Sequence, residues 1–293
     1  MTGSAAIVIL TRNGKDRLLR CLAHAARSDH RPLTIVVVDN GSTDGTVEAV
    51  KGLHPDVHVL PLARNEGVSG GRNAGVRYVE RHLGSDTIVF LDDDTQVESG
   101  AAGELIAAAR TDDRIGLVTP KAFRKKGDRR LLSAGGMRFH PFTGRLEDVA
   151  GGEIDRGQHD EPRDVQACPG FAFLVRKEVF RRIGLFDEAF NPYGWEDVDF
   201  SLRAAEAGFR IVYAPGAVVY HAGGREGRGV VDLYERHKAR NMLYFVRKHT
   251  TMLQWCCFLA ILPFRAVLRV VKEVAGGNAR AVRAWIGYPG RRD

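Results

Sequence analysis

An apolar run at residues 87–91 ends in three consecutive aspartates, Asp92, Asp93 and Asp94. The run contains β-branched residues and a phenylalanine, which is typical of a buried strand, so the aspartates follow where that strand ends. Three adjacent carboxylates repel one another and need a compensating cation. A hard divalent ion that also binds a diphosphate would supply it. An acidic, solvated loop is the alternative that stays open at this point.

The segments before this run alternate between strand-like and helix-like patterns. Such alternation predicts an α/β fold with a doubly wound, mainly parallel sheet flanked by helices. Ligands bind such sheets at the carboxyl ends of the strands. Polar tips fall at these ends, at residues 11–13, 39–42, 64–66 and 92–94. We therefore expect these tips to line one crevice.

Composition narrows the class of protein. The 293 residues are 44% hydrophobic and 27% charged, which is enough for a globular fold with a sizeable core. The four cysteines form neither a C-x-x-C pair nor a secreted framework, which favours a reducing compartment without structural zinc. The first residues show no basic segment or cleavage site of a secretory signal. These patterns predict a cytoplasmic protein.

Positive charge gathers in the last quarter, where residues 225–293 contain 14 Lys or Arg and 5 Asp or Glu. The pattern over 230–274 is helical, and its apolar section, 252–262, is too short to span a bilayer. The basic residues Arg265, Arg269 and Lys272 follow at spacings that share a helix face. Two interpretations stay open: an amphipathic segment on anionic lipid, or helices packed on the core with a solvated basic face.

Further on, a second acidic cluster, Glu196, Asp197 and Asp199, opens a helical pattern. Carboxylates in a first helical turn are favoured by the helix dipole, so ordinary capping is one interpretation and a general base beside an acceptor hydroxyl is the other. His221 ends a strand-like run and precedes two glycines. A lone histidine is more often a surface residue or a satisfied core residue than a ligand.

The glycine-rich stretch 64–75 predicts either a phosphate-binding loop or a turn before an ordinary helix. Its glycine spacing does not match the dinucleotide fingerprint, which disfavours a Rossmann-type oxidoreductase. The sequence also lacks a P-loop, a nucleophilic-serine motif and zinc-ligand spacing. Aromatic residues are not interleaved with the basic residues of the tail, so we expect no nucleic-acid binding.

Together these stretches resemble the family 2 glycosyltransferases of the GT-A fold, in the branch with bacterial rhamnosyltransferases and galactofuranosyltransferase-like enzymes. The resemblance covers about residues 5–245. The motifs that carry it, in family order, are Val37–Gly45, Asn65–Gly67 with Gly71–Gly75, Leu91–Asp94, Gly184–Phe190, Glu196–Asp199 and His221.

The resemblance implies a role for each matching residue. Asp92 and Asp94 are similar to the D-x-D pair, and His221 has the spacing of a third ligand, so these three are expected to bind Mn²⁺ or Mg²⁺. Asp197 is expected to be the catalytic base, with Trp195 and Glu196 on the acceptor side. The remaining residues expected to bind the nucleotide-sugar are Thr11, Asp39, Arg64, Asn65, Asn73 and Asp93, together with Asp92.

This family implies an inverting, metal-dependent enzyme that moves a sugar from a dTDP- or UDP-sugar, with a rhamnosyl-like sugar favoured, to a glycan or lipid-linked acceptor. The expected organisation is a catalytic domain at 1–225, with a nucleotide-sugar half at about 1–120 and an acceptor half at 121–225. A basic helical extension, 226–293, follows. The expected location is cytoplasmic and peripheral, at the inner face of the cell membrane.

The alternative function is a catalytically silent module that binds a nucleotide-sugar or a glycan at the membrane. The combination of the aspartate triplet, Asp197 and His221 argues against it, because a binding module needs no base. The acceptor half carries no motif that identifies an acceptor. Within it, residues 124–163 lack clear periodicity, so we expect an irregular segment, and we expect two short strands at 209–213 and 217–220.

Overall fold

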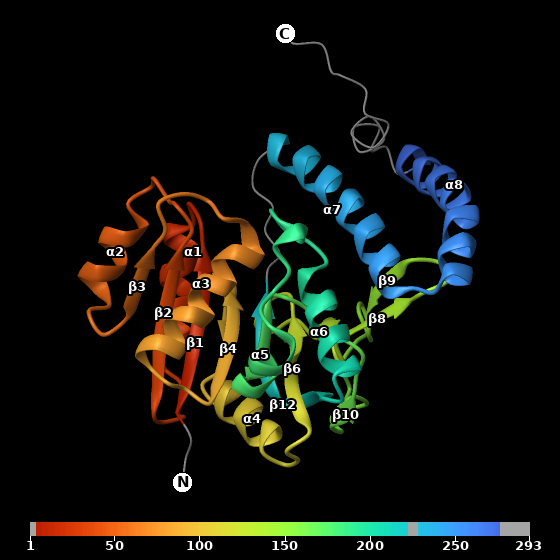
Figure 1. Cartoon of the computed structure of the whole chain (residues 1–293). Coiled ribbons are helices and arrows are strands. Elements are labelled where there is room, and N and C mark those ends of the chain that lie inside the picture. The colour runs from red at the N-terminus through yellow and green to blue at the C-terminus, as the bar shows by residue number, and fades with distance from the viewer. Residues whose placement is uncertain (1–3, 222–227, 276–293) are drawn as a thin grey trace. The chain divides into compact units, whose positions relative to one another are not determined.

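The computed structural model describes residues 4–221 and 228–275 (Figure 1). The chain divides into two compact units. The sheet unit comprises Met1–Arg138, Glu147–Pro192 and Glu196–Gly223. The helical unit comprises Phe139–Leu146, Tyr193–Trp195 and Gly224–Asp293. Each unit is therefore assembled from three stretches of chain that are separated in the sequence.

The first part of the sheet unit alternates strands and helices. The elements are β1 (Ala5–Thr11), α1 (Lys15–Ala25), β2 (Leu33–Asp39), α2 (Thr46–Leu53), β3 (His58–Pro61), α3 (Gly67–His82) and β4 (Thr87–Asp92). Strand β1 pairs in parallel with both β2 and β4, and β2 pairs in parallel with β3. The alternation in the sequence therefore corresponds to a parallel sheet with helical crossovers.

Most of the later strands extend the same sheet beyond β4. The elements are β5 (Thr95–Val97), α4 (Ala101–Ala109), β6 (Ile115–Phe123), β7 (Leu131–Ser133), β8 (Met137–His140), β9 (Arg145–Asp148), β10 (Arg163–Asp164), β11 (Ala172–Arg176), α5 (Lys177–Ile183), the 3-10 helix η1 (Glu188–Phe190), α6 (Glu196–Glu206) and β12 (Arg210–His221). The strand order is β10-β12-β6-β11-β4-β1-β2-β3, with β5 beside β12 and β7 beside β6, while β8 and β9 form a separate two-stranded sheet. Strand β11 is antiparallel to β4 and β6, whereas β12 is parallel to β6. The predicted α/β fold with flanking helices is confirmed, and its sheet is mixed, because β5, β7, β10 and β11 run antiparallel to their neighbours.

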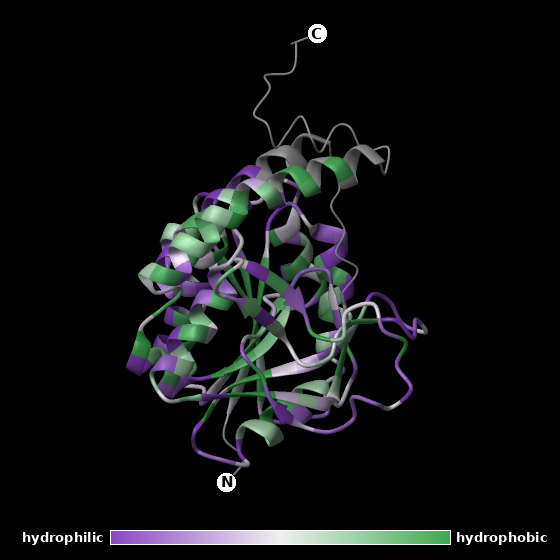
Figure 2. Ribbon diagram, turned by 90° about the vertical axis from the view of Figure 1, so that its right-hand side faces the viewer, coloured by the Kyte–Doolittle hydropathy of each residue, from purple (hydrophilic) through white to green (hydrophobic). Residues whose placement is uncertain are grey.

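Helices cover both faces of this sheet, and each face has its own apolar cluster (Figure 1). On one face, α1 and α4 contribute side chains such as Leu22 and Leu105. On the other face, α3, α5 and α6 contribute side chains such as Val76, Phe180 and Phe200. Figure 2 shows apolar residues along the strands and polar residues in many of the connecting loops. Burial on both faces explains why the strands are continuous apolar runs.

Two stretches differ from the sequence-based expectation. Residues 124–163 are not wholly irregular, because they contain β7, β8 and β9, and Arg130 bridges Ile154. These ladders are too short to produce an alternating pattern in the sequence. The two strands expected at 209–213 and 217–220 form one strand, β12, with an irregularity between Ala214 and Val218. A bulge accommodates the intervening proline and glycine, which would otherwise end a strand.

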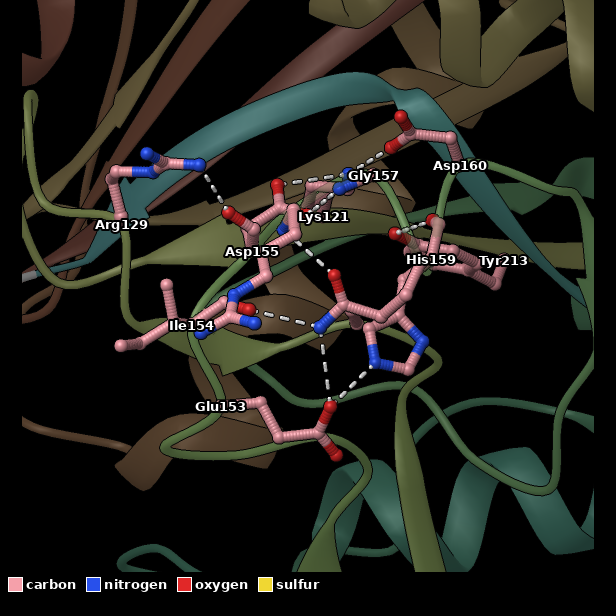
Figure 3. Close-up of polar contacts among 12 residues, drawn as sticks. Lys121, Arg129, Glu153, Ile154, Asp155, Gly157, His159, Asp160 and Tyr213 are labelled. Carbon is pink, nitrogen blue, oxygen red and sulfur yellow. Dashed lines mark hydrogen bonds and ion pairs between the residues drawn. The ribbon is translucent and has the colours of Figure 1, made fainter.

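A buried lysine anchors residues 153–160 to the sheet (Figure 3). Lys121 of β6 has a side chain only 5% exposed, and its ammonium group pairs with Asp155 at 3.1 Å and with Asp160. Tyr213 of β12 donates a hydrogen bond to the carbonyl oxygen of His159 at 3.0 Å. A buried ammonium group needs such partners because its desolvation is costly. Charge pairing therefore replaces regular secondary structure in this segment.

The helical unit contains α7 (Arg228–His249) and α8 (Met252–Ala275). An aromatic cluster joins its segments: the ring of Trp195 lies 4.8 Å from that of Phe245, and Phe139 lies 4.9 Å from Phe245. The Asn241 side chain donates to the carbonyl oxygens of Tyr193 and Gly194 at 3.0 and 3.2 Å. None of the helices in the described part of the chain combines the length and apolar content that a membrane crossing requires.

Helix α3 depends on a glycine for its approach to the sheet. A Cβ atom added at Gly75 would lie 2.6 Å from Cγ1 of Val8, whereas one added at Gly52 in α2 would meet nothing within 4 Å. We predict that Gly75→Ala lowers the free energy of unfolding by about 1–3 kcal/mol through overpacking. Gly52→Ala should leave it unchanged or raise it by up to about 1 kcal/mol. Urea denaturation of both variants measures this, and equal stability would contradict the packing.

Candidate active site

The carboxyl ends of several parallel strands meet at one edge of the sheet. In the register of the sheet, Thr11 at the end of β1 lies opposite Asp39 at the end of β2, and Leu10 lies opposite Asp92. Strand β12 points the same way as β6, and its last residue, His221, lies opposite Thr95 of β5. The strand ends predicted to face one crevice are therefore neighbours in the sheet.

A group of three potential metal ligands, Asp92, Asp94 and His221, lies at this edge. Each offers one ligand atom, and the three atoms all lie within 4.8 Å of one another. Nδ1 of His221 lies 3.0 Å from Oδ1 of Asp94, and the imidazole stacks on the Phe171 ring with centroids 4.7 Å apart. The side chains of this pair are 17% and 15% exposed. Sheet geometry therefore joins residues that are more than a hundred positions apart.

The electrostatics of this triad fit a cation. Burial raises the pKa of Asp92 to about 6, against the opposing charges of Arg72 and His221. Burial also opposes ionisation of Asp94 and His221, but the hydrogen bond between them holds the pKa of Asp94 below its ordinary value. The same contact and the charge of Asp92 raise the pKa of His221. Two carboxylates and one imidazole form a donor set that suits Mn²⁺ or Mg²⁺.

The middle aspartate of the triplet, Asp93, faces other partners. Its carboxylate accepts a hydrogen bond from Thr11 Oγ1 at 2.7 Å and pairs with Arg17 at 3.2 Å. A Cβ atom added at Gly14 would lie 2.2 Å from Oδ2 of Asp93, so a side chain there would displace the Asp93 carboxylate. Thr11 and Asp93 thus bind each other, and Asp93 stabilises the loop after β1. Contact of either residue with a nucleotide stays a prediction.

The two carboxylate oxygens of Asp39 differ in their hydrogen bonding. It is only 2% exposed, and its Oδ2 accepts the backbone N–H of Ser42 at 3.1 Å. Its buried Oδ1 has no hydrogen-bond partner among the described residues. A buried acceptor left unpaired is costly, so this atom is suited to the N–H of a ligand.

The loop before α3 holds Arg64 and Asn65. Asn40, which the sequence analysis did not single out, accepts the Glu66 N–H at 2.8 Å and donates to the Gly67 carbonyl at 2.9 Å. Asn65 accepts the N–H of Gly67 at 3.0 Å. The Arg64 side chain is 84% exposed and lies 3.5 Å from Glu66. The loop is therefore fixed while the Arg64 guanidinium remains accessible.

The Asn73 side chain makes hydrogen bonds inside the protein. Its Nδ2 donates to the carbonyl oxygen of Phe186 and to Glu188, each at 2.9 Å, and its Oδ1 accepts the N–H of Phe186 at 2.9 Å. Asn73 is only 2% exposed. The amide of Asn73 therefore holds residues 186–188 against α3, and its contact with a nucleotide-sugar stays a prediction.

Asp197 lies in the first turn of α6, with its carboxylate held by the backbone. Oδ2 accepts the N–H of Gly170 at 2.7 Å, and Oδ1 accepts the N–H of Val198 at 2.9 Å. A Cβ atom added at Gly170 would lie 3.0 Å from Oδ2, so a side chain there would displace this carboxylate by a few tenths of an ångström. These two hydrogen bonds fix the orientation of the Asp197 carboxylate.

The two acceptor-side candidates beside Asp197 are both buried. Glu196 is 5% exposed and pairs with Arg72 at 3.1 Å. Trp195 is 6% exposed, belongs to the helical unit and has a left-handed backbone with φ 78°. Its indole nitrogen has no hydrogen-bond partner among the described residues. That Trp195 and Glu196 contact the sugar acceptor stays a prediction.

Arg72 is the residue that sequence reasoning missed. Its guanidinium contacts Asp92, Glu196 and the carbonyl of Gly170. The signal was present, because Ser69, Arg72, Val76 and Val79 share the buried face of α3 and Arg72 is its charged member. A charge on the buried face of an amphipathic helix indicates a specific partner.

Solved structures share this architecture. A structure of GalNAc-T7 with UDP, GalNAc and Mn²⁺ superimposes with a TM-score of 0.61 at 20% identity, covering 80% of this chain and 47% of that one. The mannosyltransferase PcManGT from Pyrobaculum calidifontis, in complex with GDP-Man and Mn²⁺, gives a TM-score of 0.58 at 19% identity, covering 100% of this chain and 77% of that one. The fold is therefore of the GT-A class.

Sequence comparison gives the family. The model for glycosyl transferase family 2 matches residues 6–184, and the chain belongs to this family. An N-acetylglucosaminyl-diphospho-decaprenol L-rhamnosyltransferase of Mycobacterium tuberculosis is 29% identical over 267 residues, 85% of this chain and 86% of that protein. The dTDP-rhamnosyl transferase RfbF of Shigella flexneri is 24% identical, over 76% of this chain and 70% of that protein. The predicted family resemblance is confirmed.

Proposed function

We propose that this protein is an inverting, metal-dependent glycosyltransferase that moves a sugar from a nucleotide-sugar to a hydroxyl of a glycan or lipid-linked acceptor. The observation that carries the proposal is the Asp92, Asp94 and His221 triad at the same sheet edge as the fixed carboxylate Asp197. A silent binding module would need the first group of residues but not the second.

In this proposal, Asp92, Asp94 and His221 hold Mn²⁺ or Mg²⁺. When bound, the cation neutralises charge on the departing nucleoside diphosphate. Asp39 accepts an N–H of the nucleotide base through its unpaired Oδ1. Arg64 and Asn65 lie next along the edge and contact the base or ribose, while Thr11 and Asp93 shape the loop after β1.

Asp197 acts as the base. As the acceptor oxygen bonds to the anomeric carbon, the bond from that carbon to the diphosphate oxygen breaks and the hydroxyl proton passes to Asp197. The nucleophile approaches the face opposite the leaving group, so a single displacement inverts the configuration of the anomeric carbon. The two hydrogen bonds to the Asp197 carboxylate orient it for this step without a change in its position.

The relatives indicate the substrates. Two of them are named as rhamnosyltransferases, one for a dTDP-rhamnosyl donor and one for a decaprenol-linked acceptor. We propose a dTDP- or UDP-sugar donor, with a rhamnosyl-like sugar favoured, and a lipid-linked acceptor. We further propose that residues 1–120, approximately, bind the nucleotide-sugar and that residues 121–225 bind the acceptor. Residues 226–293 form the extension.

The extension supports peripheral binding to an anionic membrane at its cytoplasmic face. Helix α8 exposes large apolar side chains, with exposed fractions from 43 to 72%: Met252, Leu253, Leu259, Phe264, Val267, Leu268 and Val271. Arg247 and Lys248 at the end of α7 are exposed cations, whereas the side chains of Arg269 and Lys272 lie outside the described residues. An apolar row with nearby cations suits an anionic lipid surface.

Replacing the base tests the reaction. We predict that Asp197→Asn lowers kcat for sugar transfer roughly 10²- to 10⁴-fold, because the acceptor hydroxyl loses its proton acceptor. The Kd for the nucleotide should change little. Radiolabel transfer and calorimetry measure the two quantities, and Glu206→Gln at the exposed end of α6 is the control. Transfer by Asp197→Asn at the wild-type rate would exclude this base, and NMR of the product anomer tests inversion.

The metal site is tested by binding. We predict that Asp94→Ala and His221→Ala each weaken Mn²⁺-dependent binding of the nucleoside diphosphate by at least about tenfold, since each removes a ligand. Thermal shift with and without Mn²⁺ reports this, because a ligand that binds the native state raises its stability. Asp113→Ala, with a fully exposed carboxylate, is the control. An undiminished Mn²⁺ effect would remove the replaced residue from the metal shell.

Vesicle binding tests the extension. We predict that the protein co-sediments with phosphatidylglycerol vesicles and that replacing both Phe264 and Leu268 with aspartate weakens this at least about tenfold, because each buried side chain contributes about 1.5–3 kcal/mol. The control is Leu53→Asp in α2, since Leu53 is 65% exposed and Leu268 is 68% exposed. Equal binding by both variants, or none by the wild type, would contradict membrane docking.

A further inference from the structure

We propose that Arg72 is a positioning residue that sets the proposed base, Asp197, relative to the proposed metal ligand Asp92. This inference rests on the proposed function. Its basis is one guanidinium group that contacts elements from both sides of the site. Helix α3 supplies Arg72, β4 supplies Asp92, and α6 supplies Glu196 and Asp197.

The contacts of this guanidinium are specific. Nη2 donates to the carbonyl oxygen of Gly170 at 2.8 Å and lies 3.4 Å from Oδ1 of Asp92. Nη1 donates to Oε1 of Glu196 at 3.1 Å. The Arg72 side chain is only 4% exposed. A water-excluded charge with three separate acceptors is fixed in position and in orientation.

Two of these contacts reach Asp197 through the backbone. Gly170 accepts from Arg72 with its carbonyl and donates its own N–H to Oδ2 of Asp197 at 2.7 Å. Glu196 precedes Asp197 in the first turn of α6. Arg72 thereby holds Gly170, which donates to the proposed base, and Glu196, which precedes the base in the chain. Its third contact holds Asp92 of the proposed metal triad.

Two aromatic rings lie beside the Arg72 guanidinium and help to hold it in place. Its central carbon lies 5.6 Å from the ring centroid of Phe173 and 5.7 Å from that of Phe186. Cation–π attraction lowers the cost of keeping this charge away from water. A lysine ammonium is a compact charge that cannot stack on an aromatic ring or donate several hydrogen bonds in one plane, as a guanidinium does. Arg72→Lys therefore cannot keep all three contacts.

Arg203 offers a comparison, because its side chain is only 18% exposed but serves the packing of α6. It pairs with Asp199 at 2.8 Å and donates to the carbonyl oxygens of Ile183 and Leu185, each at 2.9 Å. Its guanidinium also lies over an aromatic ring, that of Phe200, at 5.3 Å. None of these contacts involves Asp92, Gly170 or Asp197. Loss of Arg203 therefore reports the effect of removing a largely covered, ion-paired arginine alone.

The kinetic experiment compares Arg72→Lys and Arg72→Met with Arg203→Met and with Arg77→Gln, an exposed position on α3. We expect kcat per folded molecule to fall about 10²-fold or more in both Arg72 variants, as a small misplacement of a reacting group can cause. Nucleotide Kd should rise by less than tenfold. In Arg203→Met the melting temperature should fall while kcat stays within a few-fold of wild type. If Arg72→Met kept wild-type kcat, or lost only what Arg203→Met loses, the proposal would be overturned.

A second measurement does not need activity. Amide hydrogen exchange in Arg72→Met should accelerate in the segments 168–172 and 196–201, while the strands β1 and β2 stay protected. Arg203→Met should instead loosen the segment 183–185. Unchanged exchange at 168–172 and 196–201 would overturn the positioning role even if the enzyme transfers a sugar. If the wild type transferred none, the proposed function would fail, and this exchange pattern would still decide the role of Arg72.

Discussion

The parallel register of β1, β2 and β4 is the constraint on which the site depends. Because helices cover both faces of the sheet, ligands reach it at its edge, where the carboxyl ends of these strands lie side by side. Thr11, Asp39 and Asp92 are neighbours for this reason alone. The antiparallel strand β11, inserted between β4 and β6, carries Gly170 and Phe171 to the same edge just before it begins.

Sequence patterns predicted the features that depend on neighbouring residues in the chain, namely the strands, the helices and the polar ends of the strands. The alternation of apolar runs and amphipathic helices indicated the sheet, and polar residues after each run marked the edge at Asp39 and Asp92. The roles of Arg72 and Gly170 could not be predicted from the sequence, because these two residues contact each other across 98 positions. The hydrogen bonds of Asn73 to residues 186–188 could not be predicted for the same reason, since these partners follow more than a hundred residues later. Short ladders in 124–163 left no periodic pattern to find.

Stability and proposed chemistry share the same residues in this fold. The aromatic cluster that includes Phe173 and Phe186 belongs to the core on the α3 side of the sheet and also supports the Arg72 guanidinium. Buried charges of this kind are costly without partners, so the site carboxylates and the arginine stabilise one another. Lys121 with Asp155 and Asp160 applies the same pairing away from the site, where it fixes a connecting segment.

The way the chain contributes to the helical unit has a consequence for evolution and for protein engineering. Phe139 and Trp195 come from inside the sequence of the sheet unit, yet they pack on Phe245 of α7. Deleting the C-terminal helices would leave these two aromatic side chains without their cover. The helices are therefore not a detachable module: a gene fusion or shuffling event that exchanges them must also exchange residues 139–146 and 193–195.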